Sequence, residues 1–391
     1  MDPVHNPYQP GAGRRPPELA GRDAELDAFA VLLQRYELAV GERGRVLYGL
    51  RGVGKTVLLN EFQAMAEERR WVTAKVEAAA GRSILPTLAQ ALHRSLRSAT
   101  GRFERARLLG MLEVFRAFSL RLDPDGSYTF GFDVQVATGQ ADTGNPAVDL
   151  PELFAAIGAT MRDLGVGALL LIDEMQDVPA VELRALNTAV HEMGQGPDPL
   201  PVVVVGAGLP SLPEVLAKAT SYAERLYEYV SIGALDEAFA HEALTVPAEA
   251  LGVTWQPGAL RRVDEFSHGY PYLIQTGGKY AWDYAATSPI TAEDAEAGLI
   301  QARREVDAGL YRARWQRATP LQRQIMRAMA DLSADDPTSM AQVAEMLGRE
   351  RSELSVPRDQ LIKKGLVYAP DRGLIAFTVP GMSDYARRQP D

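Results

Sequence analysis

The sequence predicts an α/β fold in which helices cover both faces of a parallel sheet, followed by an all-helical lid domain and a C-terminal winged helix. Three observations predict it. Apolar strand-like runs alternate with helical segments through the first half of the chain. Strand signals stop after about Ala234. Two short strand-like runs, Leu366–Ala369 and Leu374–Val379, then flank the turn 370–373 near the C-terminus.

The alternation in the first half defines the predicted sheet. The predicted strands are 45–49, 71–77, 168–173 and 201–206, and the predicted helices are 23–40, 55–69, 84–99 and 180–194. Strands separated by helices pair in parallel through right-handed crossovers, so helices are expected on both faces of the sheet.

The segment between residues 100 and 150 interrupts this alternation and is interpreted as an insertion. A helix is expected over 103–117. Beyond it, Phe118–Leu122 and Tyr128–Val136 flank Asp123-Pro124-Asp125-Gly126, a sequence typical of a turn, so a hairpin is predicted. A flexible stretch rich in Gly, Thr and Asn is expected to follow it.

Four parts are predicted along the chain. They are an irregular N-terminal arm over 1–18, a P-loop domain over 19–233, a helical lid over 234–316 and a winged helix over 317–391. The arm holds five prolines and is not expected to join a core. In the lid, Asp236 and the Thr291/Asp294 pair have the pattern of helix caps, and Pro257 suits a first helical turn.

Composition excludes several classes of protein. The 391 residues contain no cysteine, which excludes disulfide frameworks and thiolate metal sites and suits a reducing compartment. The longest apolar runs, 166–172 and 202–209, are far shorter than the roughly 18 residues that cross a bilayer. A cytoplasmic protein without a membrane segment is therefore expected. The net charge of −10 argues against non-specific attraction to nucleic acid over the whole surface.

A phosphate-binding motif follows the first predicted strand. Its eight residues are Gly49, Leu50, Arg51, Gly52, Val53, Gly54, Lys55 and Thr56, and Val57 continues into the predicted helix. The pattern G-x-x-x-x-G-K-[ST] between a strand and a helix directs backbone N–H groups and the helix N-terminus at phosphate oxygens. Lys55 is expected to reach the outer phosphates, and the Thr56 hydroxyl is expected to bind Mg²⁺.

Two carboxylates end the apolar run 168–172. Asp173 and Glu174 would emerge at the carboxyl edge of a buried parallel strand, where the phosphate loop is also expected. Asp173 is predicted to hold Mg²⁺, and Glu174 to orient and deprotonate the attacking water. Gln176 and Asp177 follow, and they suit either solvated loop positions or supporting contacts. The five histidines show no metal-ligand spacing, so no metal beyond Mg²⁺ is expected.

With both motifs placed, the chain resembles the AAA+ and STAND P-loop ATPases of the ASCE type, in particular the origin-recognition-like, archaeal-type branch. Gly21 and Arg22 resemble that branch's opening motif, which packs beside adenine, although a bare turn would also fit. Gly269-Tyr270-Pro271 resembles the lid motif that touches the base, or else a plain interhelical turn. The resemblance implies ATP as ligand, and Arg225 lies near the position of an arginine that enters a neighbouring subunit's site.

The chain departs from the family at two positions. Gly206-Ala207-Gly208 replaces a polar residue that helps to position water, and the lid has proline in place of a phosphate-sensing arginine. Slow hydrolysis therefore becomes plausible. The main alternative is a nucleotide-gated scaffold or regulator with negligible turnover. A small-molecule kinase is disfavoured because this lid and a winged helix make a poor substrate pocket.

The C-terminal module leaves two kinds of partner open. Its predicted recognition helix, 352–364, and the residues just before it carry five basic side chains: Arg349, Arg351, Arg358, Lys363 and Lys364. A helix of this kind can lie in a major groove and hold phosphates. Yet residues 319–391 contain ten basic and ten acidic residues, so the module could bind duplex DNA, or it could serve for protein contact or for holding the lid.

Overall fold

The computed structural model describes the whole chain except residues 12, 123–134, 196–197, 335 and 391. The chain divides into two compact units. One comprises Asp23–Tyr48 and Lys55–Ser231, and the other comprises Met1–Arg22, Gly49–Gly54 and Ile232–Asp391. The first six residues of the phosphate loop thus group with the C-terminal half, whereas the domain limits predicted above place them with the sheet.

The first unit is built on a five-stranded parallel sheet. Its strands are β1 (Gly44–Tyr48), β2 (Val72–Glu77), β3 (Ala168–Asp173), β4 (Val202–Gly208) and β5 (Tyr227–Ser231), in the order β2-β3-β4-β1-β5. The predicted parallel α/β sheet is confirmed. The edge strand β5 was not predicted, because its sequence Tyr-Glu-Tyr-Val-Ser has only one fully buried residue, Tyr227, and no continuous apolar run.

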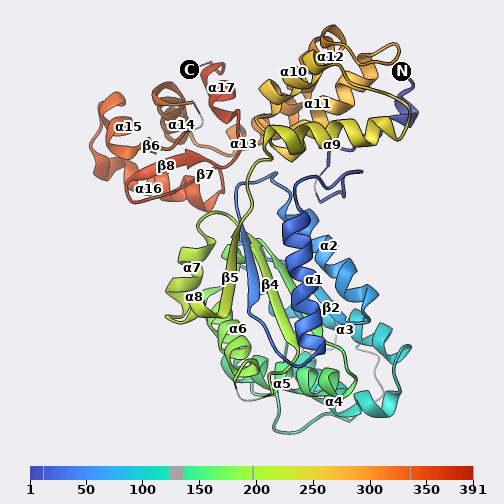
Figure 1. The fold of residues 1–391 in the computed structure, drawn as a ribbon. Coiled ribbons are helices and arrows are strands. Elements are labelled where there is room, and N and C mark those ends of the chain that lie inside the picture. Colours follow the sequence, from blue (N-terminus) through green and yellow to red (C-terminus); the bar gives the residue numbers. More distant parts are fainter. Residues whose placement is uncertain (12, 123–134, 196–197, 335, 391) are drawn as a thin grey trace. The chain divides into compact units, whose positions relative to one another are not determined.

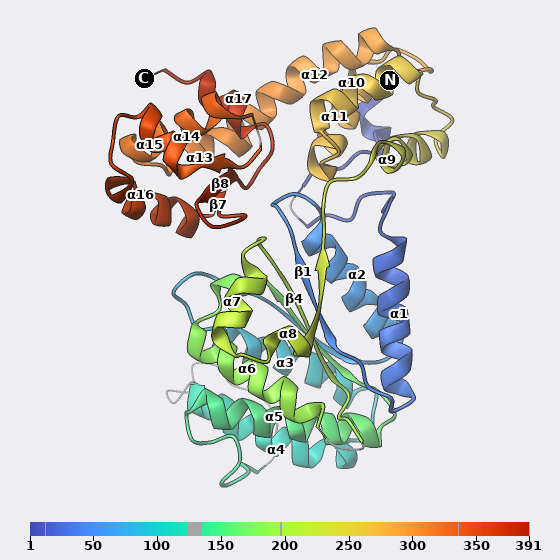
Figure 2. The same ribbon diagram turned by 60° about the vertical axis from the view of Figure 1, so that its left-hand side comes forward.

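Helices cover both faces of this sheet. They are α1 (Asp23–Glu37), α2 (Lys55–Glu68), α3 (Leu85–Thr100), α4 (Arg105–Leu122), α5 (Pro146–Asp163), α6 (Ala180–Met193), α7 (Leu212–Ala219) and α8 (Ala223–Leu226). Helices α1 and α2 lie on one side of the sheet, and α6 and α7 lie on the other (Figures 1 and 2). The buried rings of Phe29 and Phe62 stack at 4.1 Å and join α1 to α2.

The predicted hairpin in the 100–150 segment is wrong. Helix α4 continues through Phe118–Leu122, because Leu108, Met111, Phe115 and Phe118 recur at helical spacing and are all buried. The second predicted strand, Tyr128–Val136, falls almost entirely outside the described residues. Helix α5 begins within the stretch expected to be flexible, where Asn145 accepts a hydrogen bond from the Ala147 N–H at 3.1 Å and caps the helix.

In the second unit, the segment that starts at Ile232 opens with the helices predicted for the lid. They are α9 (Glu237–Glu249), α10 (Pro257–Ser267), α11 (Pro271–Tyr284) and α12 (Ala292–Val306), followed by a π-helical turn, Asp307–Tyr311, and α13 (Arg312–Gln316). The helix caps behave as predicted. Asp236 accepts from the Phe239 N–H, Pro257 starts α10, and Thr291 and Asp294 form a capping box.

The N-terminal residues differ from expectation. They are mostly irregular apart from a 3₁₀ turn, Pro3–His5, but Tyr8 is only 3% exposed and lies in the hydrophobic cluster of the lid helices. The Tyr8 hydroxyl donates to the carbonyl of Leu244 and accepts from the indole N–H of Trp255 at 2.9 Å. The prolines indicate irregular backbone correctly, yet one aromatic residue is sufficient to fix the segment to a core.

The C-terminal segment combines helices with a small antiparallel sheet. Its elements are α14 (Pro320–Leu332), β6 (Thr338–Ser339), α15 (Met340–Met346), α16 (Arg351–Lys363), β7 (Val367–Tyr368), β8 (Leu374–Phe377) and α17 (Met382–Arg387), with strand order β6-β8-β7. The three predicted helices and both predicted strands are present, and β6 and α17 are additional. Across the described part of the chain, no helix combines the length and apolar character needed to cross a membrane.

Candidate nucleotide-binding site

Strand β3 delivers two carboxylates at its carboxyl end. All six residues of the strand are buried, and the Asp173 side chain at its end is only 7% exposed. Glu174 follows with φ +49°, a left-handed conformation that is uncommon outside glycine and clusters at functional sites. This left-handed residue follows the last residue of the strand, Asp173, and leads into the 3₁₀ turn Met175–Asp177.

Helix α2 brings the end of the phosphate motif to Asp173. Lys55 is the first residue of α2 and is 9% exposed. The Thr56 hydroxyl donates to Asp173 Oδ2 at 2.7 Å, and the Glu174 N–H donates to Asp173 Oδ1 at 3.0 Å. Residues 117 positions apart in the sequence therefore form one oxygen-rich group beside the positive N-terminal end of α2.

The remaining motif residues form a loop with tightly fixed backbone. Gly52 and Gly54 have φ of +88° and +97°, which only glycine adopts without strain. At Gly49 a side chain would collide with the carbonyl oxygen of Ile232. Arg22, 8% exposed, donates to the carbonyls of Val53 at 3.2 Å and Gly233 at 2.7 Å. Arg22 thus braces the phosphate loop itself, a contact that the sequence did not reveal.

The two motifs predicted to contact the base have different surroundings. Gly21 has φ +66° and packs so closely on Phe239 that a side chain would clash with its ring. Pro271 starts α11, as the interhelical-turn reading expects, and Tyr270 packs on the C-terminal hydrophobic cluster. Tyr272, one residue further on, lies beside Gly52 of the loop. Their contact with adenine remains a proposal.

Comparison with known proteins agrees with this geometry. Residues 18–205 match the family described as AAA ATPase domain, and residues 308–386 match a domain of unknown function. The AAA+ P-loop ATPase assignment made from the motifs is thereby confirmed.

Two archaeal structures share the fold of this AAA+ chain. The Walker-type ATPase of Pyrococcus abyssi has 16% identity and a TM-score of 0.59, covering 94% of this chain and 96% of its own. The ORC2 protein of Aeropyrum pernix, solved with ADPNP and ADP, has 16% identity and a TM-score of 0.56, covering 96% of this chain and 94% of its own. No curated protein sequence matches the chain.

Gln176 links the AAA+ chain's Glu174 to strand β4. Its amide N–H donates to Glu174 Oε2 at 2.6 Å, and its Oε1 accepts from the Leu209 N–H at 3.0 Å. A side chain at Gly208 would collide with this Oε1. The glycine that seemed to deprive the site of a polar group therefore makes room for one supplied by Gln176, and of the two interpretations of Gln176 the structure favours a supporting contact.

Replacing Gln176 with alanine is expected to lower kcat roughly 10- to 100-fold with little change in the ATP concentration at half-maximal rate. Without its amide, Glu174 loses a charge-assisted hydrogen bond that fixes its position. Gln176→Glu keeps the side-chain shape, removes the donor and should lose activity similarly. A change confined to KM in steady-state kinetics would contradict this positioning role.

Lys75 is a second residue that the sequence did not single out. It lies in β2, whose pairing with β3 aligns Glu77 with Asp173, and its ammonium donates to Asn60 Oδ1 on α2. Burial lowers the pKa of Lys75, while the nearby Asp173 carboxylate acts in the opposite direction. A cation in strand β2 thus contributes to the potential around the carboxylates of the AAA ATPase domain.

The donor set at Thr56 and Asp173 fits Mg²⁺. A hydroxyl and a carboxylate are hard oxygen ligands, and Mg²⁺ in nucleotide sites is typically held by one or two such groups together with substrate phosphates and water. Asp173 is buried. Its Oδ2 accepts a hydrogen bond from Thr56 at the start of α2, and its Oδ1 accepts one from the Glu174 backbone N–H. These two residues are therefore the ones that would hold the ion.

Two further arginines, Arg225 and Arg314, bear on the candidate site. Arg225 lies in the short helix α8 and is exposed, so its guanidinium is available to a neighbouring molecule. Arg314 in α13 is half-buried, and its burial, together with the nearby Arg51 and Arg317, lowers its pKa to about 10. Arg314 therefore places a cation near Arg51 of the phosphate loop, and no motif in the sequence had pointed to it.

Proposed function

We propose that this chain binds ATP with Mg²⁺, hydrolyses it, and couples its nucleotide state to movement of its C-terminal module. The observation that carries the proposal is the group formed by Thr56, Asp173 and Glu174, in which the Asp173 carboxylate accepts hydrogen bonds from the Thr56 hydroxyl at the start of α2 and from the Glu174 backbone N–H. Multiple-turnover release of phosphate from ATP, dependent on Glu174 and on Mg²⁺, is the expected result. Absence of turnover despite tight ATP binding would favour the scaffold alternative.

Each residue has a distinct role in the proposed reaction. Lys55 and the N–H groups of the loop would hold the β- and γ-phosphates. Mg²⁺, held by Thr56 and Asp173, would supply charge neutralisation at the phosphates. Glu174, fixed by Gln176, would take a proton from the water that attacks the γ-phosphorus, and the bond to the β–γ bridging oxygen breaks to release ADP and phosphate.

A direct contact supports coupling to the C-terminal module. The Arg51 N–H in the phosphate loop donates to the Thr378 carbonyl at 3.2 Å, and Gly365 approaches the Arg51 guanidinium so closely that a side chain there would crowd it. The Thr378 hydroxyl in turn donates to the Gly365 carbonyl at 2.8 Å. A loop that changes shape with nucleotide would shift these contacts, which is a population shift between two arrangements.

ATP and ADP are expected to give different small-angle scattering profiles and different protease cleavage patterns. The Lys55→Ala variant, which should bind neither nucleotide well, is the control and should give the nucleotide-free pattern throughout. Identical profiles with ATP and with ADP, at concentrations where both are bound, would overturn the proposed coupling.

The charges on α16 limit the proposed DNA contact. Arg349 pairs with Glu353, Arg358 pairs with Asp359, and Lys364 donates to the Arg317 carbonyl and to Gln322. Arg351 and Lys363 remain exposed. Two phosphate contacts correspond to a log–log salt slope of only about 2, so we infer that duplex DNA, if bound, is held through a small electrostatic footprint. Arg225 stands as the proposed contact to a second copy.

A further inference from the structure

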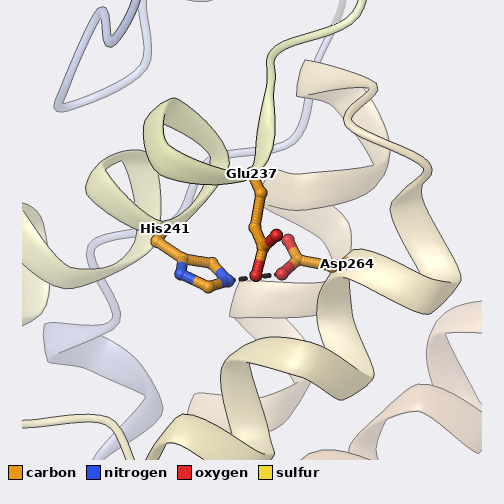
Figure 3. A group of neighbouring side chains, drawn as sticks. All are labelled: Glu237, His241 and Asp264. Carbon is orange, nitrogen blue, oxygen red and sulfur yellow. Dashed lines mark hydrogen bonds and ion pairs between the residues drawn. The ribbon is translucent and has the colours of Figure 1, made fainter.

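Three side chains of types that can bind metal ions meet between two helices of the lid. They lie far from the phosphate motif in the sequence. Glu237 and His241 lie one turn apart on α9, and Asp264 lies on α10. Residues four apart share one face of a helix, so both α9 side chains project toward α10. Figure 3 shows the three side chains pointing toward one another. Their potential ligand atoms all lie within 4.8 Å of one another.

One carboxylate oxygen of this group has no hydrogen-bond partner among the described residues. His241 Nε2 contacts Asp264 Oδ2, but Asp264 Oδ1 is buried and accepts no hydrogen bond from any residue that the structure describes. Glu237 brings a second carboxylate to the same place. Burial raises the pKa of Asp264, the hydrogen bond and charge of His241 oppose that rise, and the nearby Glu237 and Glu265 carboxylates add to it. A buried carboxylate oxygen without a partner is costly unless a cation or donor satisfies it.

We propose that Glu237, His241 and Asp264 bind a divalent transition-metal ion of the Zn²⁺ class. One imidazole and two carboxylates match the nitrogen and oxygen ligands of Zn²⁺, whereas Mg²⁺ and Ca²⁺ prefer oxygen ligands alone. A tetrahedral ion with bonds of about 2.0–2.2 Å holds its ligand atoms roughly 3.5 Å apart. The ligand atoms already lie within 4.8 Å of one another, and the Glu237 side chain is exposed.

A cavity beside the group leaves room for a fourth ligand. It measures about 390 Å³ and is lined by Glu237 and Asp264 together with Leu235 and Gly269. Three protein ligands with one open position is the arrangement of zinc sites that bind water or an exchangeable group. The Leu235 N–H donates to the Gly269 carbonyl at 2.8 Å, so an ion here would fix α9 to α10 beside the segment that leads into α11.

Other charged groups on the same cavity define the competing explanation. Arg261, Glu265 and His268 also line it. Arg261 is exposed and forms no hydrogen bond with Asp264 Oδ1. If Arg261 alone balanced the two carboxylates, the group would be an ordinary ion-pair cluster and would bind no metal.

The test is calorimetric titration of Zn²⁺ into the full chain, produced without a polyhistidine tag, stripped with chelator and held in excess Mg²⁺ without nucleotide. One equivalent is expected to bind with a Kd in the micromolar range or below. Asp264→Asn and Glu237→Gln should each weaken binding at least tenfold. The matched control is Glu265→Gln, on the same helix and cavity but outside the group, and it should bind as the wild type does.

His5 provides the second control, because it contacts Asp2 at 2.9 Å in an exposed pair that offers Zn²⁺ another pair of ligands. His5→Ala should still bind one equivalent of Zn²⁺. The proposal is overturned if no stoichiometric binding occurs, if Asp264→Asn and Glu237→Gln bind as the wild type does, or if His5→Ala removes the site. Far-UV circular dichroism verifies that each variant folds, and Zn²⁺ should raise the Tm of the wild type more than that of Asp264→Asn.

Discussion

Replacing Glu174 with glutamine is expected to lower ATP turnover by about 10²- to 10⁴-fold and to leave ATP binding near the wild-type level. The substitution keeps the shape of the side chain but removes the group that accepts a proton from water. Asp173 and Thr56, which lie beside it and hold their own hydrogen bond, are unchanged. Single-turnover and steady-state phosphate release, together with nucleotide titration, measure the two effects separately.

Glu77 is the matched control for Glu174. It ends the neighbouring strand β2, aligned with Asp173, and its side chain is exposed. Glu77→Gln removes the same charge at the same edge of the sheet and should change turnover by less than about threefold, as expected for an exposed charge. Turnover of Glu174→Gln within a few fold of the wild type would remove Glu174 from the role of base.

Replacing Lys55 with alanine is expected to weaken ATP binding roughly 30- to 4,000-fold. Truncating one member of a buried charge pair costs about 2–5 kcal/mol, and each 1.4 kcal/mol is tenfold in affinity. Lys55 is 9% exposed at the first position of α2, so its contact with phosphate would be largely desolvated. Titration with a fluorescent ATP analogue measures the change.

Lys218 provides the control for Lys55. It is an exposed lysine on α7 that pairs with Glu214 at 2.7 Å, and Lys218→Ala should bind ATP as the wild type does. ATP affinity that is unchanged in Lys55→Ala would show that the phosphates bind elsewhere in the chain.

The core of the candidate site was predictable because it is local in sequence. The glycines and Lys55-Thr56 occupy consecutive positions between a strand and a helix, and Asp173 and Glu174 end an uninterrupted apolar run. Parallel strands carry their carboxyl ends to one edge, so two local patterns suffice to place four residues near one another. The Thr56–Asp173 hydrogen bond is the structural outcome of that rule.

Elements whose signal depends on tertiary packing were harder to predict. The turn sequence 123–126 suggested strands on both sides, but Phe118 and its partners at helical spacing continue α4 up to Leu122. Edge strand β5 has alternating polar residues because much of it is exposed. Tyr8 lies among prolines and reveals its burial only through Leu244 and Trp255, more than 200 residues away.

The supporting residues of the site depend on contacts distant in sequence. Gln176 can support Glu174 only because the fold places Leu209, just after β4, beside it. The need for glycine at position 208 is likewise visible only in the structure, where a side chain there would collide with the Gln176 Oε1. The lid group was missed because histidine spacing alone was considered. The Glu237/His241 spacing of four residues was the available signal, and Asp264 joins them only through helix packing.

Steady-state measurement with the full chain is the most direct test of whether this protein hydrolyses ATP. Phosphate release is measured with Mg²⁺ across a range of protein concentrations, with and without duplex DNA, and with Lys55→Ala and Glu174→Gln as blanks. We expect Mg²⁺-dependent turnover well above both blanks, and a rate per chain that rises with concentration if Arg225 completes a neighbour's site. Turnover equal to the blanks under every condition, despite tight ATP binding, would contradict the proposal that this AAA+ chain is a hydrolase.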